Sequence, residues 1–319
     1  CGSLPGASLN LLRLRQAHAR AAGDDRAYLA ATLELLARAP REPEHAVLAL
    51  RAGEAAARLG DLPLATSLLE RAAQADPEDV VLWGMLADVH TRAGDVAGAA
   101  AACESLARAS TVRDHKLLAF YDAGRMWIDE VGDLDRGVRA LEEVAALDIR
   151  FQDTFARLSA VYTRKGAAAE LARLLERQLD VVEDTGERVD VQVERARMLL
   201  RVGDRDAARV CLEAALDDAP EHLSALAAFA DLAHLQQDWT AAEQAWIRLA
   251  VVLPSPPEQR EVYLRLGELY AGPLANLPRA ELAFREVLKR TPDDTATMDR
   301  LVAIYQKMGD TNRAVEMLG

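Results

Sequence analysis

Apolar residues recur along the chain at spacings of three and four, in paired stretches separated by short polar breaks. Residues 46–59 form one such stretch and residues 63–75 form the next. This spacing is the signature of α-helices that bury one face. Gly60 suits the left-handed cap that ends the first helix, Asp61 caps the start of the second, and Pro77 stops it. Together these residues predict a helical hairpin.

The hairpin pattern recurs along the whole chain. When the sequence is shifted by 143 residues it lies on itself without a gap, so that Gly60 falls on Gly203 and Pro77 falls on Pro220. Each period of 143 residues contains four shorter units. A fixed period predicts a stack of similar units, each of which buries its apolar face against its neighbours. The units start near residues 9, 46, 80, 117, 152, 189, 223, 260 and 295.

These units resemble the tetratricopeptide repeat (TPR) family. That pattern has a small residue at position eight, an aromatic residue near eleven, Gly near fifteen, Ala at twenty and twenty-seven, and Pro at thirty-two. The second unit matches it with Gly53, Gly60, Ala65, Ala72 and Pro77. The eighth unit is the best match, with Tyr263, Leu266, Gly267, Tyr270, Ala280, Phe284, Val287 and Pro292.

The resemblance implies an all-α fold, a right-handed TPR-like solenoid of about nine helix-turn-helix units. We expect a lead segment at residues 1–8 and a single solenoid over residues 9–319, with a truncated last unit. A solenoid end without a polar cap exposes apolar surface, so self-association through open ends is a further expectation.

Some features depart from the pattern. Tyr28, Gly137 and Leu171 stand where Ala is expected, and we expect looser packing around them. Odd-numbered units carry about three extra residues before the next unit, in connecting segments such as 41–44 and 254–257. The fourth and eighth units also share one extra residue between their two helices.

Charge and composition narrow the classes of function. The formal net charge of −13 argues against a nucleic-acid-binding surface. No stretch is long and apolar enough to span a membrane. Cys1, Cys103 and Cys211 form neither a zinc motif nor a disulfide framework. We expect a cytoplasmic protein, although the N-terminal Cys-Gly-Ser also resembles a processed bacterial lipoprotein that is exported and anchored through Cys1.

No motif for catalysis, cofactor binding or metal binding is present. The chain lacks a phosphate-binding loop, a nucleophile elbow and a zinc-protease helix. The six histidines never pair at helical spacing, and His90 occupies a packing position of its unit. Cys103 and Cys211 are interpreted as small buried hydrophobic residues. We therefore predict no catalytic, cofactor or metal site and no enzymatic activity.

In TPR proteins the first helix of each hairpin lines a concave groove through its positions two, five, nine, twelve and thirteen, and this resemblance implies a charge map. Six arginines occupy groove positions: Arg58, Arg92, Arg125, Arg164, Arg197 and Arg201. Acidic residues follow nearer the C-terminus, at Asp231, Glu261, Glu268 and Asp299. One hypothesis is that the arginines hold an acidic peptide, because guanidinium groups pair with carboxylates. The alternative is that they lie near helix ends, where they complement the helix dipole and remain solvated.

The sequence thus predicts a non-catalytic scaffold that binds protein or peptide segments in the groove of a TPR array. Two alternatives stay open at this point. The first alternative is a lipid-anchored exported lipoprotein that helps to assemble a surface structure. The second is the regulatory arm of an enzyme whose catalytic domain lies elsewhere.

Overall fold

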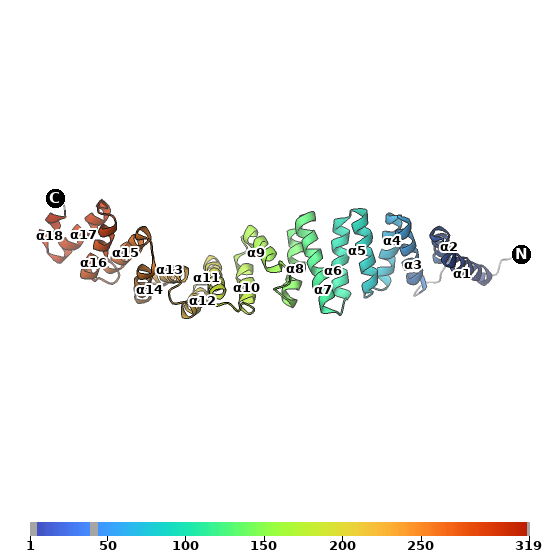
Figure 1. The fold of residues 1–319 in the computed structure, drawn as a ribbon, viewed down its shortest axis with the longest axis horizontal. Helices are drawn as coiled ribbons and strands as arrows, with labels where there is room; N and C mark the ends of the chain where they lie inside the picture. Colours follow the sequence, from blue (N-terminus) through green and yellow to red (C-terminus); the bar gives the residue numbers. More distant parts are fainter. Residues whose placement is uncertain (1–4, 39–43, 318–319) are drawn as a thin grey trace. The chain divides into compact units, whose positions relative to one another are not determined.

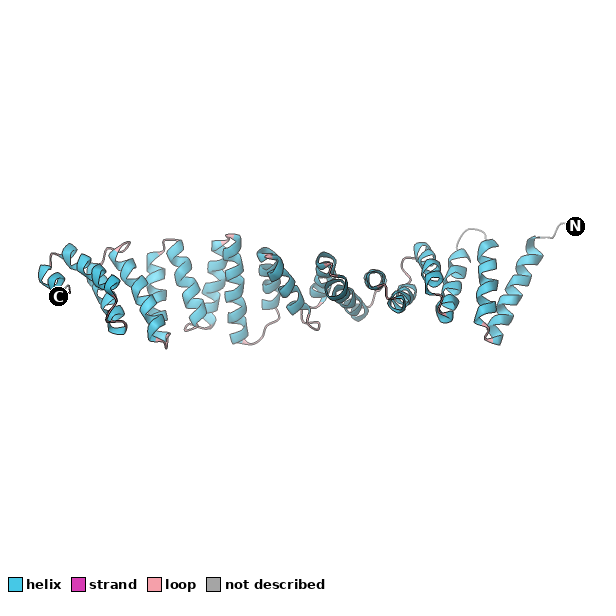
Figure 2. Ribbon diagram, turned by 90° about the horizontal axis from the view of Figure 1, so that it is seen from above, coloured by secondary structure: helices cyan, strands magenta, loops and turns pink. Residues whose placement is uncertain are grey.

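The computed structural model describes residues 5–38 and 44–317, which fold into helices and turns without any β-strand (Figures 1 and 2). The first helices of the successive hairpins are α1 (Pro5–Ala22), α3 (Glu44–Leu59), α5 (Val80–Ala93), α7 (Arg113–Arg125) with its continuation η1 (Met126–Val131), α9 (Thr154–Lys165), α11 (Thr185–Val202), α13 (Leu223–Leu235), α15 (Pro256–Ala271) and α17 (Thr295–Met308). The second helices are α2 (Asp25–Arg38), α4 (Leu62–Ala75), α6 (Val96–Ala109), α8 (Leu134–Leu147), α10 (Ala168–Leu179), α12 (Arg205–Asp218), α14 (Trp239–Val252), α16 (Leu277–Arg290) and α18 (Thr311–Glu316). The predicted all-α array of hairpins is confirmed.

The chain forms two compact units, which we call the N-terminal half (residues 1–161) and the C-terminal half (residues 162–319). Within each half, helices pack mainly against the helices that precede and follow them in sequence. First helices also contact one another, as α3 does with α5 and α11 with α13. None of the described helices has the length and hydrophobicity that crossing a bilayer requires. Cys1, on which the lipoprotein hypothesis rests, lies outside the described residues.

The turn between the two helices of a hairpin uses the same chemistry in most repeats. In the second repeat Gly60 has φ +81°, a conformation that favours glycine because it has no Cβ. Asp61 follows, and its carboxylate accepts a hydrogen bond of 3.2 Å from the backbone N–H of Leu64. The seventh repeat keeps the capping Asp238 but places Gln237 in the left-handed position, at φ +62°. The predicted caps Gly60 and Asp61 are thus confirmed, while the turns of the seventh and eighth repeats place the non-glycine residues Gln237 and Ala275 at positive φ.

Small residues occupy the points where paired helices cross. A Cβ added to Gly53 would lie 2.7 Å from a carbon of Leu69, and one added to Gly267 would lie 2.5 Å from the ring of Phe284. The second-helix side chains therefore fill the space that the glycines leave. Both glycines stand at the eighth position of their units, where the repeat pattern has a small residue.

The expectation of looser packing at Gly137 is wrong. A Cβ at this position would lie 2.4 Å from Cγ1 of Ile128 and 3.0 Å from the carbonyl oxygen of Gly124. The backbones of α7 and α8 come this close because both helices carry glycine at the crossing. Tyr28 and Leu171, the other departures from the repeat pattern, are also buried.

The extra residues before the sixth and eighth repeats lengthen their first helices instead of forming loops, whereas residues 41–43 of the corresponding connection before the second repeat lie outside the described residues. The first helices α3, α11 and α15 contain 16, 18 and 16 residues. Their counterparts in odd-numbered repeats, α5, α13 and α17, contain 14, 13 and 14 residues. Helix α15 begins at Pro256, inside the segment expected to be a connection, because proline is tolerated in the first turn of a helix. From α3 onward, long and short first helices thus alternate along the chain.

The single extra residue shared by the fourth and eighth repeats is accommodated in two different ways. In the fourth repeat the end of the first helix widens into the π-helix η1. A hydrogen bond from i to i+5 encloses one more residue than the i to i+4 bond of an α-helix. In the eighth repeat α15 remains an α-helix to Ala271, and the extra residue lies in the turn, where Ala275 takes a positive φ of 48°.

Candidate functional site

The six arginines predicted to bind a partner are divided between the halves, and Arg58 is already engaged. Its guanidinium donates to the Asp25 carboxylate through Nη2 at 2.8 Å and through Nε at 3.1 Å. These hydrogen bonds hold the pKa of Asp25 below its usual value. Arg58 therefore joins the second repeat to the first through a two-pronged ion pair.

Three more of the predicted arginines bind groups of their own chain. Arg92 donates to the backbone carbonyl of Ala57 at 2.8 Å and also lies 3.4 Å from the Asp88 carboxylate. Arg125 pairs with Glu130, and Arg197 pairs with Glu194, each at 3.3 Å. Arg164 and Arg201, in the C-terminal half, are exposed and have no such partner among the described residues. Four of the six predicted arginines therefore already bind groups of this chain, and the six do not form a continuous row of free guanidinium groups.

Three of the four acidic residues expected near the C-terminus contact arginines of first helices, and Asp299 has no ion-pair partner among the described residues. Arg265 of α15 binds Asp231 of α13 and lies 3.5 Å from Glu261. Arg300 of α17 pairs with Glu268 of α15 at 3.0 Å. These pairs link successive first helices and reduce the negative charge of this face.

An open hollow of about 820 Å³ lies in the C-terminal half, which we call the C-terminal hollow. It is formed by α11, α13, α14 and α15, so that first helices of three successive repeats contribute to it. Most of its lining is apolar, and the charged residues at it are Arg197, Asp231, Glu258, Glu261 and Arg265. The apolar lining comprises Leu200, Leu223, Ala227, Ala228, Leu232, Leu235, Trp246, Leu249, Leu253, Pro254 and Val262.

The charges around the C-terminal hollow do not contribute equally. Arg197 and Arg265 are engaged by the carboxylates described above. Glu258, at the start of α15, has no ion-pair partner among the residues that the structure describes. The hollow therefore offers a partner an apolar surface with one carboxylate beside it that has no ion-pair partner in the described part of the chain.

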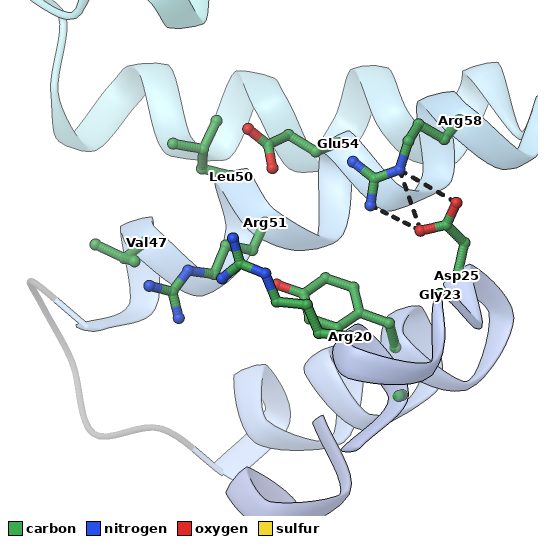
Figure 3. A pocket seen from close by; sticks show the side chains of 10 residues that line it. Arg20, Gly23, Asp25, Val47, Leu50, Arg51, Glu54 and Arg58 are labelled. Atoms are coloured by element: carbon green, nitrogen blue, oxygen red, sulfur yellow. Dashed lines mark hydrogen bonds and ion pairs between the residues drawn. The ribbon is translucent and has the colours of Figure 1, made fainter. Parts of the chain in front are cut away.

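A second hollow of about 550 Å³ lies in the N-terminal half, between α1, α2 and α3, and we call it the N-terminal hollow. Figure 3 shows Arg20 and Arg51 beside each other in it, with the Arg58–Asp25 ion pair at its far end. Glu54 also lines it, and the apolar part of the lining includes Val47 and Leu50.

The sequence interpretation did not single out Arg20 or Arg51. Arg20 stands at the twelfth position of the first unit, which the TPR pattern does place in the groove, so a signal for it existed. Arg51 stands at the sixth position of the second unit, which that pattern does not assign to the groove. Helix α2 packs against both α1 and α3, and this arrangement brings the two side chains into the same hollow.

Comparisons with known proteins agree with this geometry. Residues 56–114 and residues 193–260 each match a tetratricopeptide repeat family model. The chain contains tetratricopeptide repeats. No curated protein sequence matches it at a significant level.

Several solved structures resemble this TPR chain. The C-terminal part of a TPR repeat-containing protein from Cytophaga hutchinsonii is 14% identical, with 79% of this chain and 99% of that one covered and a TM-score of 0.45. A variant of MamA is 22% identical, with 54% and 95% covered and a TM-score of 0.40. YrrB, described as a TPR protein with an unusual peptide-binding site, is 15% identical, with 57% and 90% covered and a TM-score of 0.41.

The titratable groups of the TPR hairpins serve packing and capping. Nδ1 of His90 lies 2.8 Å from the carboxylate of Asp95, the residue that caps α6. Burial raises the pKa of the Cys103 thiol to about 11 and also raises the pKa of Cys211. Both thiols are therefore protonated and weakly nucleophilic near neutral pH. No cluster of three His, Cys, Asp or Glu residues that could bind a metal occurs among the described residues.

Proposed function

We propose that this chain is a non-catalytic interaction scaffold that binds a segment of a partner protein in the C-terminal hollow. Its TPR repeats support a role in protein interaction in general. The observation that carries the specific proposal is that the hollow is lined by large apolar side chains and is open to solvent.

Leu223 and Leu235 expose apolar surface to water when the hollow is empty, and covering this surface is favourable. These two leucines of α13 are 38% and 58% exposed, although they line a concave surface together with buried Leu232 and Trp246. Covering apolar surface stabilises a complex by roughly 25 cal/mol for each Å² removed from water. A hollow of about 820 Å³ lies within the range of specific ligand sites and can receive several side chains.

The chemistry of the hollow defines the partner segment. Apolar anchors fit the leucine-rich lining, and their burial supplies most of the affinity at such interfaces. A basic residue beside the anchors would pair with Glu258, the carboxylate that no described residue neutralises. We therefore propose a short segment with two or three large apolar side chains and a neighbouring Lys or Arg.

Selection from a random peptide library tests this proposal, because it does not require the partner protein to be identified. Random 12-residue peptides are selected against the full chain, and the dissociation constants of the selected peptides are measured by fluorescence polarisation. The expected peptides carry apolar anchors with a basic flank, and the Leu223→Glu/Leu235→Glu variant binds them at least tenfold more weakly.

The matched control is Val251→Glu. Val251 of α14 is 78% exposed and does not line the hollow, so this variant adds a charge in the same repeat without touching the site. It should bind the selected peptides as the unaltered chain does. Peptides that bind the leucine variant with unchanged affinity would rule out the C-terminal hollow as their site.

A further inference from the structure

The N-terminal hollow has the opposite chemistry to the C-terminal one. We propose that it binds an anionic group of an acidic protein segment, either neighbouring carboxylates or a phosphorylated side chain, between Arg20 and Arg51. This site is independent of the C-terminal hollow, so either can fail without the other.

Two unpaired guanidinium groups carry the proposal. Arg20 of α1 and Arg51 of α3 line the same hollow and also a smaller adjoining one of about 370 Å³. Neither has a carboxylate or hydrogen-bond partner among the described residues, whereas Arg58 at the far end is satisfied by Asp25. Like charges held close together repel each other, and an anion between them removes this repulsion. Each guanidinium can donate two parallel hydrogen bonds to a carboxylate or phosphate.

The distribution of charge along the chain supports an anionic ligand at this end. Residues 1–60 contain eight arginines, no lysine and six acidic residues, which gives them a net charge of +2. Since the whole chain carries −13, the remaining residues sum to −15. The stretch that contains α1, α2 and α3 thus carries a small positive charge, and an acidic segment is attracted to it more than to the remaining chain.

Two side chains in the hollow shape its selectivity. Glu54 lines the hollow without an ion-pair partner of its own in the described part of the chain, so it opposes an incoming anion. Tyr28 is buried and lines both the main hollow and the adjoining one, where it provides a fixed wall. The proposal thus places the acidic segment at Arg20 and Arg51 instead of along the six arginines that the repeat pattern selects.

Fluorescence polarisation with three labelled peptides of equal length tests the site on the full chain. The first peptide carries three consecutive Glu residues, the second replaces them by Gln, and the third carries one phosphoserine between two Gln residues. The Glu or the phosphoserine peptide should bind at least tenfold more tightly than the Gln peptide in 0.15 M salt. Whichever of the two binds more tightly identifies the source of the anion.

Charge-matched variants separate the site from general attraction. Arg20→Glu/Arg51→Glu should abolish the preference for the anionic peptides, and Glu54→Gln should strengthen their binding about threefold or more. The control variant Arg15→Glu/Arg26→Glu changes the net charge of the chain by the same amount. Arg15 and Arg26 are exposed residues of the first repeat that lie outside the hollow, so this variant should retain most of the binding.

Equal losses in the two arginine pairs would overturn the proposal, as would equal binding of all three peptides. Circular dichroism verifies that each variant remains helical. The Leu223→Glu/Leu235→Glu variant should bind the anionic peptides normally, so failure of the C-terminal site and failure of this one are distinguishable.

Discussion

Gly124 and Gly137 face each other where α7 crosses α8, and no other residue fits either position without movement. A Cβ on Gly124 would lie 2.7 Å from Leu141 and 3.2 Å from the Gly137 carbonyl oxygen. A neighbouring side chain can shift to admit a methyl group. A backbone carbonyl group inside a packed helix can shift only at a large cost in free energy. At the residue scale, the two helices of this hairpin can lie close together because the glycines at their crossing have no Cβ.

The Gly137→Ala variant should be destabilised by about 1–3 kcal/mol, the usual cost of overpacking a tight core. Helix propensity alone favours alanine over glycine and predicts the opposite sign. Urea denaturation followed by circular dichroism measures the free energy of unfolding. Gly98→Ala is not a suitable control because His90 and Asp95 surround it. Gly84→Ala is a suitable control, because its added Cβ lies at an ordinary contact distance of 3.5 Å from Leu106.

At the scale of elements, a buried carboxylate joins the last two hairpins. Glu281 of α16 is only 7% exposed and accepts a hydrogen bond of 3.2 Å from the hydroxyl of Tyr305 in α17. Arg285 of the same helix lies 2.9 Å away, and Arg313 of α18 lies 3.1 Å away. One side chain thus contacts three helices, and α18 is held in part by this ion pair.

The Glu281→Ala variant should loosen α17 and α18 by about 1–3 kcal/mol, because hydrogen bonds and ion pairs to a charged group are lost at a buried site. Hydrogen exchange measured by mass spectrometry should show faster exchange over residues 295–317 and no change over residues 205–218. Glu281→Gln retains an acceptor for Tyr305 and should have a smaller effect. Equal exchange in all three proteins would contradict a role for Glu281 in holding these helices.

At the scale of the whole chain, aspartates at helix starts make stability depend on pH. Hydrogen bonds from Arg209 and from the backbone N–H of Ala241 lower the pKa of Asp238. A hydrogen bond from Arg260 lowers the pKa of Asp294, and the N–H of Gly98 lowers that of Asp95. A lowered pKa in the folded chain means that the stabilisation is fully present above the ordinary value of 3.8 and is lost as the pH falls below it.

The thermal midpoint should therefore be nearly constant from pH 7 to about pH 5 and should fall steeply below about pH 4. Circular dichroism melts between pH 2 and pH 7 measure it. Asp238→Asn still caps α14 but cannot pair with Arg209 as an anion, so its midpoint should be lower at pH 7 and should decline less on acidification. A midpoint that rises on acidification would contradict this assignment.

Local signals predicted most of the fold because each hairpin is specified by its own residues. Asp61 and Pro77 begin and end helices through backbone chemistry that does not depend on distant contacts. The long first helices were harder to predict, because a segment such as 254–257 contains prolines that suit a loop and a first helical turn equally. The hollows were not predictable in this way. Whether an arginine is free depends on partners such as Asp25, which lies 33 residues from Arg58 in sequence.

The alternation of long and short first helices makes a pair of hairpins, and not a single one, the natural building block of this chain. Excising one hairpin would set two long or two short first helices next to each other and would mismatch the side chains at the new junction. Excising two successive hairpins would keep a long first helix beside a short one at the new junction. Arrays of altered length should therefore be assembled two hairpins at a time.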